Sequence, residues 1–272
     1  ASVAATDIIH FKDNIYVGFA SSTSYIYGTG TTWTASTLAG NGNNAKYWAT
    51  ALNSAGAYAL WKSETVNTVA SATDATNTGA WATAITVGSA DREITKLFNA
   101  FNTLIVGKED GFWRYNRVVN DWSAADVFFN EAPDYDVAVS TDNFSRGTQW
   151  LGWLYLTTAQ QGFIRWRPGE FQDISSLFTA PRLTDFGGRI RAVAGEPRQL
   201  FVLGDTPTTD TSSTKTTRLM SLRLDPHGEV RSPHVLANVS IGDINWLAVF
   251  NGYVYAFGVL TNDDLANEVA SI

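Results

Sequence analysis

Residues 98–107 read Phe-Asn-Ala-Phe-Asn-Thr-Leu-Ile-Val-Gly: an apolar run, a short polar turn, a second apolar run and a closing residue that is usually small. The same phrase recurs along the chain in five other places, at Phe11–Gly18, Leu52–Trp61, Trp150–Thr157, Ala194–Gly204 and Val249–Gly258. The closing residues follow one another at steps of about 43 to 54 residues. Two apolar runs around a turn predict a β-hairpin, so the chain repeats one hairpin-containing unit.

A repeat of this length built from short strands predicts the blades of a β-propeller. We therefore expect an all-β fold, a single domain over residues 1–272 with six four-stranded blades. The expected blades cover residues 7–40, 45–88, 93–130, 136–180, 187–238 and 242–272. The last blade shows three strands, so residues 2–6 are expected to supply its outer strand and close the propeller, which removes unpaired edges. The alternative is a longer protein whose remaining blade lies beyond Ile272.

The composition agrees with a strand-rich protein. Hydrophobic residues make up 44% of the chain, and ten Trp with fifteen Phe are enough for a large core. Charged residues make up 17%, so Thr, Ser, Asn and Gly must provide much of the polar surface. These residues are poor helix formers, which favours strands and turns.

His10 lies in an apolar run and is expected in the core.

Charge and cysteine content argue against several function classes. The formal net charge is −7, so we expect no nucleic-acid partner, which would need a basic face. No stretch of about eighteen apolar residues occurs, so we expect no membrane insertion. The chain has no cysteine and three histidines without metal-ligand spacing, so we expect neither a metal site nor a cofactor.

A second element follows the repeated phrase: a turn and then an aromatic residue, at Trp33, Trp81, Trp122 and Phe171. An aromatic at the same point of each blade is expected to pack against the next blade. The stretch Tyr115–Trp122 resembles the Tyr…Trp spacing of kelch repeats, and Leu104–Tyr115 is similar to repeats of two-component-regulator sensor propellers and of phage virion propellers. The Gly-Gly pair of kelch repeats is missing from this blade. The resemblance implies a propeller fold.

Candidate binding residues come from loops and aromatic clusters. Asp205, Asp210 and Lys215 belong to a polar insertion, residues 205–218, and long loops on a rigid scaffold often carry binding residues. Trp150 and Trp153 offer rings on which a sugar could stack, with Asp134 and Asp136 as nearby acidic residues. The alternatives are a tolerated surface loop and core tryptophans packed between blades.

Catalytic patterns are weak. The enzymes that use propellers include glycoside hydrolases, for which the candidate carboxylates are Asp134 with Asp136, Glu131 and Asp185. A sialidase-like site would use Tyr135 with acidic partners and the arginines Arg146, Arg165, Arg189 and Arg191. The Asp box of sialidases lacks its defining residue here, because Tyr27 stands where the Asp should be. No catalytic residue is therefore assigned.

These observations predict a non-catalytic recognition or assembly module whose partners are other protein subunits of an assembly. The repeat style and the Thr/Asn/Gly-rich, cysteine-free composition favour a virion component such as a phage tail, fibre or capsid decoration, or an extracellular location. Two alternatives remain open: an extracellular propeller that binds or cleaves a surface glycan, and the sensor domain of a larger bacterial surface protein.

Overall fold

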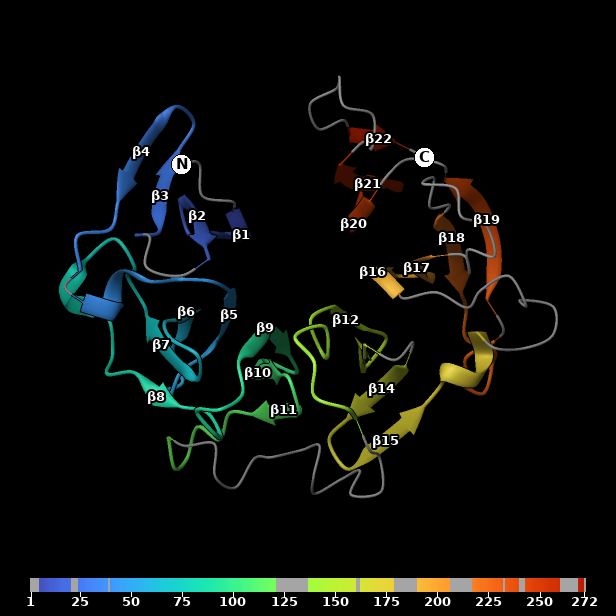
Figure 1. The fold of residues 1–272 in the computed structure, drawn as a ribbon, viewed down its shortest axis with the longest axis horizontal. Coiled ribbons are helices and arrows are strands. Elements are labelled where there is room, and N and C mark those ends of the chain that lie inside the picture. The colour runs from blue at the N-terminus through green and yellow to red at the C-terminus, as the bar shows by residue number, and fades with distance from the viewer. Residues whose placement is uncertain are drawn as a thin grey trace. The chain divides into compact units, whose positions relative to one another are not determined.

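The computed structural model describes residues 5–20, 24–38, 40–120, 137–159, 162–178, 190–205, 217–231, 233–239, 243–259 and 269–271. The chain divides into two compact units, Ala1–Ser145 and Arg146–Ile272. Figure 1 shows that strands dominate both units. The described residues contain three short 3-10 helices, Gly40–Asn43, Thr78–Ala80 and Ser175–Phe178, and no α-helix. Nothing in this part of the chain forms a helix that could cross a membrane.

The first unit contains three antiparallel sheets. The first sheet consists of β1 (Ala5–Phe11), β2 (Asn14–Phe19), β3 (Ile26–Thr29) and β4 (Thr32–Ala35). The second consists of β5 (Trp48–Leu52), β6 (Tyr58–Ser63), β7 (Thr68–Ala72) and β8 (Ile85–Thr86). The third consists of β9 (Ile94–Ala100), β10 (Thr103–Lys108) and β11 (Gly111–Arg114). In each sheet neighbouring strands follow one another along the chain.

The second unit repeats this arrangement. Its first sheet consists of β12 (Gly147–Trp150), β13 (Trp153–Thr157), β14 (Phe163–Arg167) and β15 (Glu170–Asp173). The next consists of β16 (Ile190–Glu196), β17 (Gln199–Asp205), β18 (Thr217–Leu222) and β19 (His234–Val239). The last consists of β20 (Asp243–Phe250), β21 (Tyr253–Val259) and β22 (Val269–Ser271).

Within each unit, the first strands of successive sheets lie beside one another: β1, β5 and β9 in one, β12, β16 and β20 in the other. Antiparallel meanders of three or four strands that meet through their first strands are the blades of a β-propeller. The predicted all-β propeller fold is thus confirmed, with six such sheets among the described residues. The single domain predicted for residues 1–272 stays a prediction.

The predicted closing strand at residues 2–6 falls partly outside the described residues. Ala5 and Thr6 belong to β1, where Ala5 pairs with Phe19 of β2. Residues 2–4 lie outside the described ranges, as do residues 121–136, where the fourth strand of the third blade was expected. Closure of the propeller therefore stays a prediction.

The hydrophobic core lies between consecutive sheets of each unit. In the first unit, one cluster joins the first two sheets around Tyr16, Trp48 and Leu60, and another joins the second and third around Trp61 and Leu104. In the second unit, corresponding clusters lie between its first two and its last two sheets. Strand alternation explains this pattern, because every second side chain of a strand faces the neighbouring sheet.

Alternation also corrects the expectation for His10. Ile9 and Phe11 face the core cluster of the first two sheets. His10 lies between them on β1, points to the opposite face of the sheet and is exposed. The apolar run around it was therefore misread as buried on both faces.

The aromatic residues predicted to open outer strands differ from one another. Trp33 is 43% exposed. Trp81 packs on the ring of Trp48 in its own sheet and on that of Tyr25, which precedes β3, with centroids 6.4 and 6.1 Å away. It thus belongs to the core between the first and second sheets. Phe171 is partly buried on β15, and Trp122 lies outside the described residues.

The closing glycine of the repeated phrase has a physical cause in two copies. A Cβ atom on Gly18 would lie 2.5 Å from the carbonyl oxygen of Ala45, and one on Gly107 would lie 2.5 Å from that of Phe144. In both places the segment that follows the sheet crosses directly over the strand. Glycine is required there because any side chain would collide with backbone.

Hairpin turns also follow local chemistry. Asn251 and Gly252 join β20 to β21 with φ values of 51° and 79°, the two positive values that a type I′ turn needs. In the first hairpin the positive φ falls on Lys12, at 52°.

Candidate functional site

One cleft lies entirely within the first unit, where β2 and β6 end and β9 begins. We call it the rim cleft; it has a volume of about 430 Å³ and is lined by Phe19, Lys46, Glu64, Val66, Glu93 and Ile94, among others. Apolar atoms form most of its wall area, although six of its ten lining residues carry polar or charged side chains. Clefts of this size and lining are typical of ligand-binding sites.

An ion pair stands at the edge of the rim cleft. The Lys46 ammonium lies 3.2 Å from the Glu93 carboxylate, and their side chains are 36% and 47% exposed. Burial would lower the pKa of Lys46, but Tyr47 and Glu93 outweigh it and raise that pKa above its ordinary value. Exposed pairs of this kind contribute little to stability, about 0.2–1 kcal/mol, so this pair can exchange partners at low cost.

A buried lysine lies behind the wall of the cleft. Lys62 has no exposed surface, and its ammonium pairs with Glu64 at 2.8 Å and donates to the backbone carbonyl of Gly42. Burial lowers the pKa of Lys62, and Glu64 opposes that effect. The Glu64 side chain, 11% exposed, is thereby fixed in the wall.

A second buried carboxylate ties the first strands of the unit together. Asp7 on β1 accepts a hydrogen bond from the backbone N–H of Trp48 at 2.9 Å and pairs with Lys96 on β9 at 2.7 Å. Residues from three sheets are joined by this one side chain. The strand ends beside the rim cleft are therefore held rigidly.

The second unit contains a cross-strand ladder of polar side chains on one face of its first sheet. Strand register places Arg165 opposite Gln172 and Arg167 opposite Glu170. Both guanidinium groups also lie over the ring of Trp153, 4.2 and 4.3 Å from its centroid. Arg167 is bound by Glu170 through its Nε at 2.7 Å.

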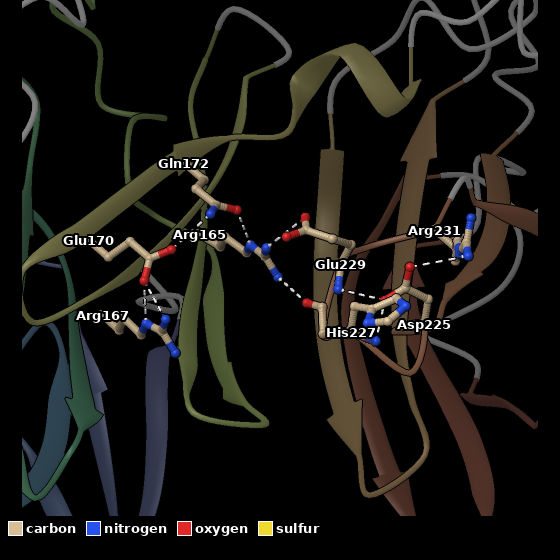
Figure 2. Close-up of polar contacts among 9 residues, drawn as sticks. Arg165, Arg167, Glu170, Gln172, Asp225, His227, Glu229 and Arg231 are labelled. Atoms are coloured by element: carbon tan, nitrogen blue, oxygen red, sulfur yellow. Dashed lines mark hydrogen bonds and ion pairs between the residues drawn. The ribbon is translucent and has the colours of Figure 1, made fainter.

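Arg165 connects this sheet to the hairpin that follows β18 (Figure 2). Its Nε donates to Gln172 at 2.7 Å, Nη1 to the Gly228 carbonyl at 3.2 Å and Nη2 to Glu229 at 3.4 Å. Arg165 is 1% exposed. Tyr155, also buried, has its pKa raised by burial, an effect that Arg165 opposes.

The hairpin itself is held by Asp225 (Figure 2). Its Oδ1 accepts the backbone N–H groups of His227 and Glu229, and its Oδ2 pairs with Arg231 at 3.1 Å. These hydrogen bonds, that of Glu229 first, keep the pKa of Asp225 below its ordinary value. Gly228 supplies the positive φ of 82° that completes the turn.

A second hollow, which we call the arginine hollow, opens between β15, the 3-10 helix Ser175–Phe178 and this hairpin. Its volume is about 450 Å³, and Arg165, Gln172, Asp173, Leu177, Glu229 and Val230 are among its lining residues. Polar atoms form most of its wall, in contrast to the rim cleft.

Trp150 and Trp153 do not offer stacking surfaces. They are 4% and 6% exposed, and Trp150 donates its Nε1–H to the Glu196 carbonyl. The expected sugar platform is replaced by the alternative, core packing between sheets, since both rings belong to the cluster that joins β13 to β17.

The other predicted site residues are not brought together in the described structure. Asp205 forms a bidentate pair with Arg191 across β16 and β17, at 2.8–2.9 Å. The Nε of Arg146 donates to the Arg191 carbonyl. Asp134 and Asp136, together with Asp210 and Lys215, lie outside the described residues. The described residues contain no group of three acidic or histidine side chains able to hold a metal ion.

Sequence reasoning missed Lys46, Lys62, Glu93 and Glu229. One signal was available: a lysine follows the closing residue of the repeat in two copies, at Lys62 and Lys108. A charged residue that recurs at the end of an apolar strand indicates a buried charged side chain, which needs hydrogen-bond or ion-pair partners. The pairings across sheets had no such signal.

Comparison with known proteins supports the fold. No protein family and no curated protein matches the sequence. The computationally designed Ika8 protein aligns with 11% identity and a TM-score of 0.50, over 93% of this chain and 80% of its own. YjhT aligns with 11% identity and a TM-score of 0.52, over 99% and 94%. The N-terminal domain of Nup159 aligns with 12% identity and a TM-score of 0.44, over 97% of this chain and 67% of its own. The first two likenesses concern fold alone.

Proposed function

We propose that this chain is a non-catalytic β-propeller module that binds other protein subunits of a virion or another extracellular assembly. The rim cleft carries the proposal. It is a preformed concavity whose walls belong to strands fixed by the buried contacts of Asp7 and Lys62. A rigid cleft lowers the ordering cost of binding a partner.

The chemistry of the cleft favours a basic side chain from the partner. Phe19 and Val66 offer an apolar surface for an aliphatic stem, and Glu93 offers a carboxylate for its charged head. The Glu64 carboxylate is bound by the buried Lys62. The ammonium group of Lys46 already forms such an ion pair with the Glu93 carboxylate. The net charge of −7 agrees with a partner of opposite charge, which acidic surfaces attract during association.

Size fractionation of the native source tests the assembly role. Peptides of this chain, followed by mass spectrometry, are expected in fractions of large particles. Their recovery only at the size of a single chain would overturn the proposed role.

A charge reversal then tests the cleft within the recovered particle. Glu93→Lys is expected to reduce the incorporation of the chain about tenfold, as loss of one close charge pair in an interface does. Asp13→Lys makes the same charge change on an exposed turn outside the cleft and is expected to incorporate normally. Equal loss in both variants would remove the cleft from the interface.

A further inference from the structure

Arg165 carries a positive charge that is buried, because its side chain is 2% exposed. Burying a charge is costly unless the charge is paired and hydrogen-bonded. Two of its three hydrogen-bond partners, Gln172 and the Gly228 carbonyl, are neutral. Among the described residues, Glu229 is the one carboxylate paired with it.

That carboxylate is a weak partner by position and by distance. The Glu229 side chain is 68% exposed at a hairpin, and its oxygen lies 3.4 Å from Nη2, against 2.7 Å for the neutral Gln172 contact. Figure 2 shows Glu229 approaching the guanidinium from the hairpin side. The exposed Glu229 side chain has room to move into solvent, but the buried guanidinium then needs another anion to keep its charge paired.

The arginine hollow opens at this contact, since Arg165 and Glu229 both line it. If the Glu229 side chain turns outward into solvent, Nη2 of Arg165 faces the hollow. The guanidinium is already oriented by Gln172 and by the Trp153 ring, 4.2 Å from its carbon. An Nη2 group oriented in this way can donate a charge-assisted hydrogen bond to a carboxylate.

We propose that the arginine hollow binds a carboxylate-bearing sugar, whose carboxylate takes the place of Glu229 on Arg165. The site is separate from the rim cleft, and the inference does not rest on the proposed assembly role. Glu229 is the internal occupant that keeps the buried charge paired while the hollow is empty.

The rest of the wall explains the choice of a sugar. Asp173 supplies a carboxylate for ring hydroxyls, and the volume of about 450 Å³ accepts one or two sugar rings. The Gln172 amide accepts from Arg165 and donates to Glu170 at 2.9 Å, so its part is to orient the guanidinium. The Oδ1 of Asp173 is committed to the backbone N–H and hydroxyl of Ser175, which fixes the direction of the carboxylate. Leu177 and Val230 add aliphatic surface for the C–H face of a ring.

The test is an NMR titration of the full chain with glucuronate, with glucose as the probe that lacks the carboxylate and propionate as the one that lacks the ring. We expect glucuronate to bind at least about tenfold more tightly than either, because a charge-assisted hydrogen bond contributes more than a neutral one. Glucose binding equal to glucuronate would overturn the carboxylate assignment. Propionate binding equal to glucuronate would overturn the assignment to a sugar.

A variant that removes the Glu229 carboxylate tests the proposed displacement directly. Glu229→Ala is expected to bind glucuronate roughly two- to fivefold more tightly, the range that loss of a weak competing ion pair allows. Asp91→Ala removes one negative charge from an exposed turn in the other unit and is the matched control. Equal affinity in the two variants would refute the displacement of Glu229.

A variant of Arg165 completes the experiment. Arg165→Lys keeps the charge but not the planar guanidinium that Gln172 and the Gly228 carbonyl orient, and is expected to lose about tenfold in glucuronate affinity. Should that buried substitution fail to fold, Gln172→Ala, which frees the guanidinium from its orienting contact, is expected to weaken glucuronate binding several-fold. Unchanged affinity in the folded variants would overturn the assignment.

Discussion

Replacement of Lys108 by Met tests whether a buried ammonium sets the stability of the third sheet. Lys108 has no exposed surface, and its Nζ donates to the backbone carbonyls of Val87 and Ser89 at 2.7 and 2.6 Å. The ring of Trp113 lies 5.4 Å away. Burial, opposed by Asp110, lowers the pKa of Lys108 from 10.5 to about 8.

The sign and size of the effect follow from this shift. Because the folded-state pKa is below the unfolded one, the unfolded chain binds the proton more strongly, and stability rises with pH between the two values. From pH 8 to about pH 9.5 the free energy of unfolding should rise by about 1.5 kcal/mol through this lysine alone. The window stops below about pH 10, where unfolded tyrosines begin to ionise.

The assay is urea denaturation followed by tryptophan fluorescence, for the native chain and for Lys108→Met at each pH. The stability of the native chain relative to the variant should rise across the window. Lys12→Met, which removes one lysine charge at an exposed turn, is the matched control. A flat or falling difference for Lys108→Met would refute the assigned charge burial.

Three further outcomes are expected. Gly107→Ala places a Cβ 2.5 Å from the Phe144 carbonyl oxygen and should destabilise the chain by about 1–3 kcal/mol in denaturant titrations. Trp150→Phe removes the donor to the Glu196 carbonyl and should cost about 0.5–1.5 kcal/mol by the same measurement. The stability contributed by the ionised Asp225 is present above its ordinary pKa of 3.8 and is lost as the pH falls below that value. NMR titration of the Asp225 carboxyl should give a pKa below 3.8. In Asp225→Asn, the free energy of unfolding should fall less steeply as the pH is lowered through this range.

Local sequence patterns were sufficient for much of the fold. The stretch Phe98–Gly107 was expected to form a hairpin, and β9 and β10 pair there through a turn at Phe101 and Asn102. Its closing glycine proved to reflect a backbone approach from Phe144, which a repeat can indicate but not explain. Hairpins were predictable because both strands and their turn lie within about ten residues of one another.

The candidate sites were much less accessible to sequence reasoning. Trp150 and Trp153 were two of the aromatic candidates for ligand contact, and both are buried between sheets. Arg165 was considered as a group that grips a substrate, but its partner Glu229 is 64 residues away along the chain. Long-range pairings of this kind leave no periodic signal.

The sequence by itself determined the repeating hairpins and the all-β class, because these depend on neighbours along the chain, and the repeat marked where glycine closes a strand. Only the tertiary structure decided which side chains face one another across sheets. Lys46 meets Glu93, and Arg165 meets Glu229, because consecutive sheets pack at a fixed register. A one-residue slip in any strand would turn those side chains to the opposite face, so the sites are properties of register and packing rather than of local sequence.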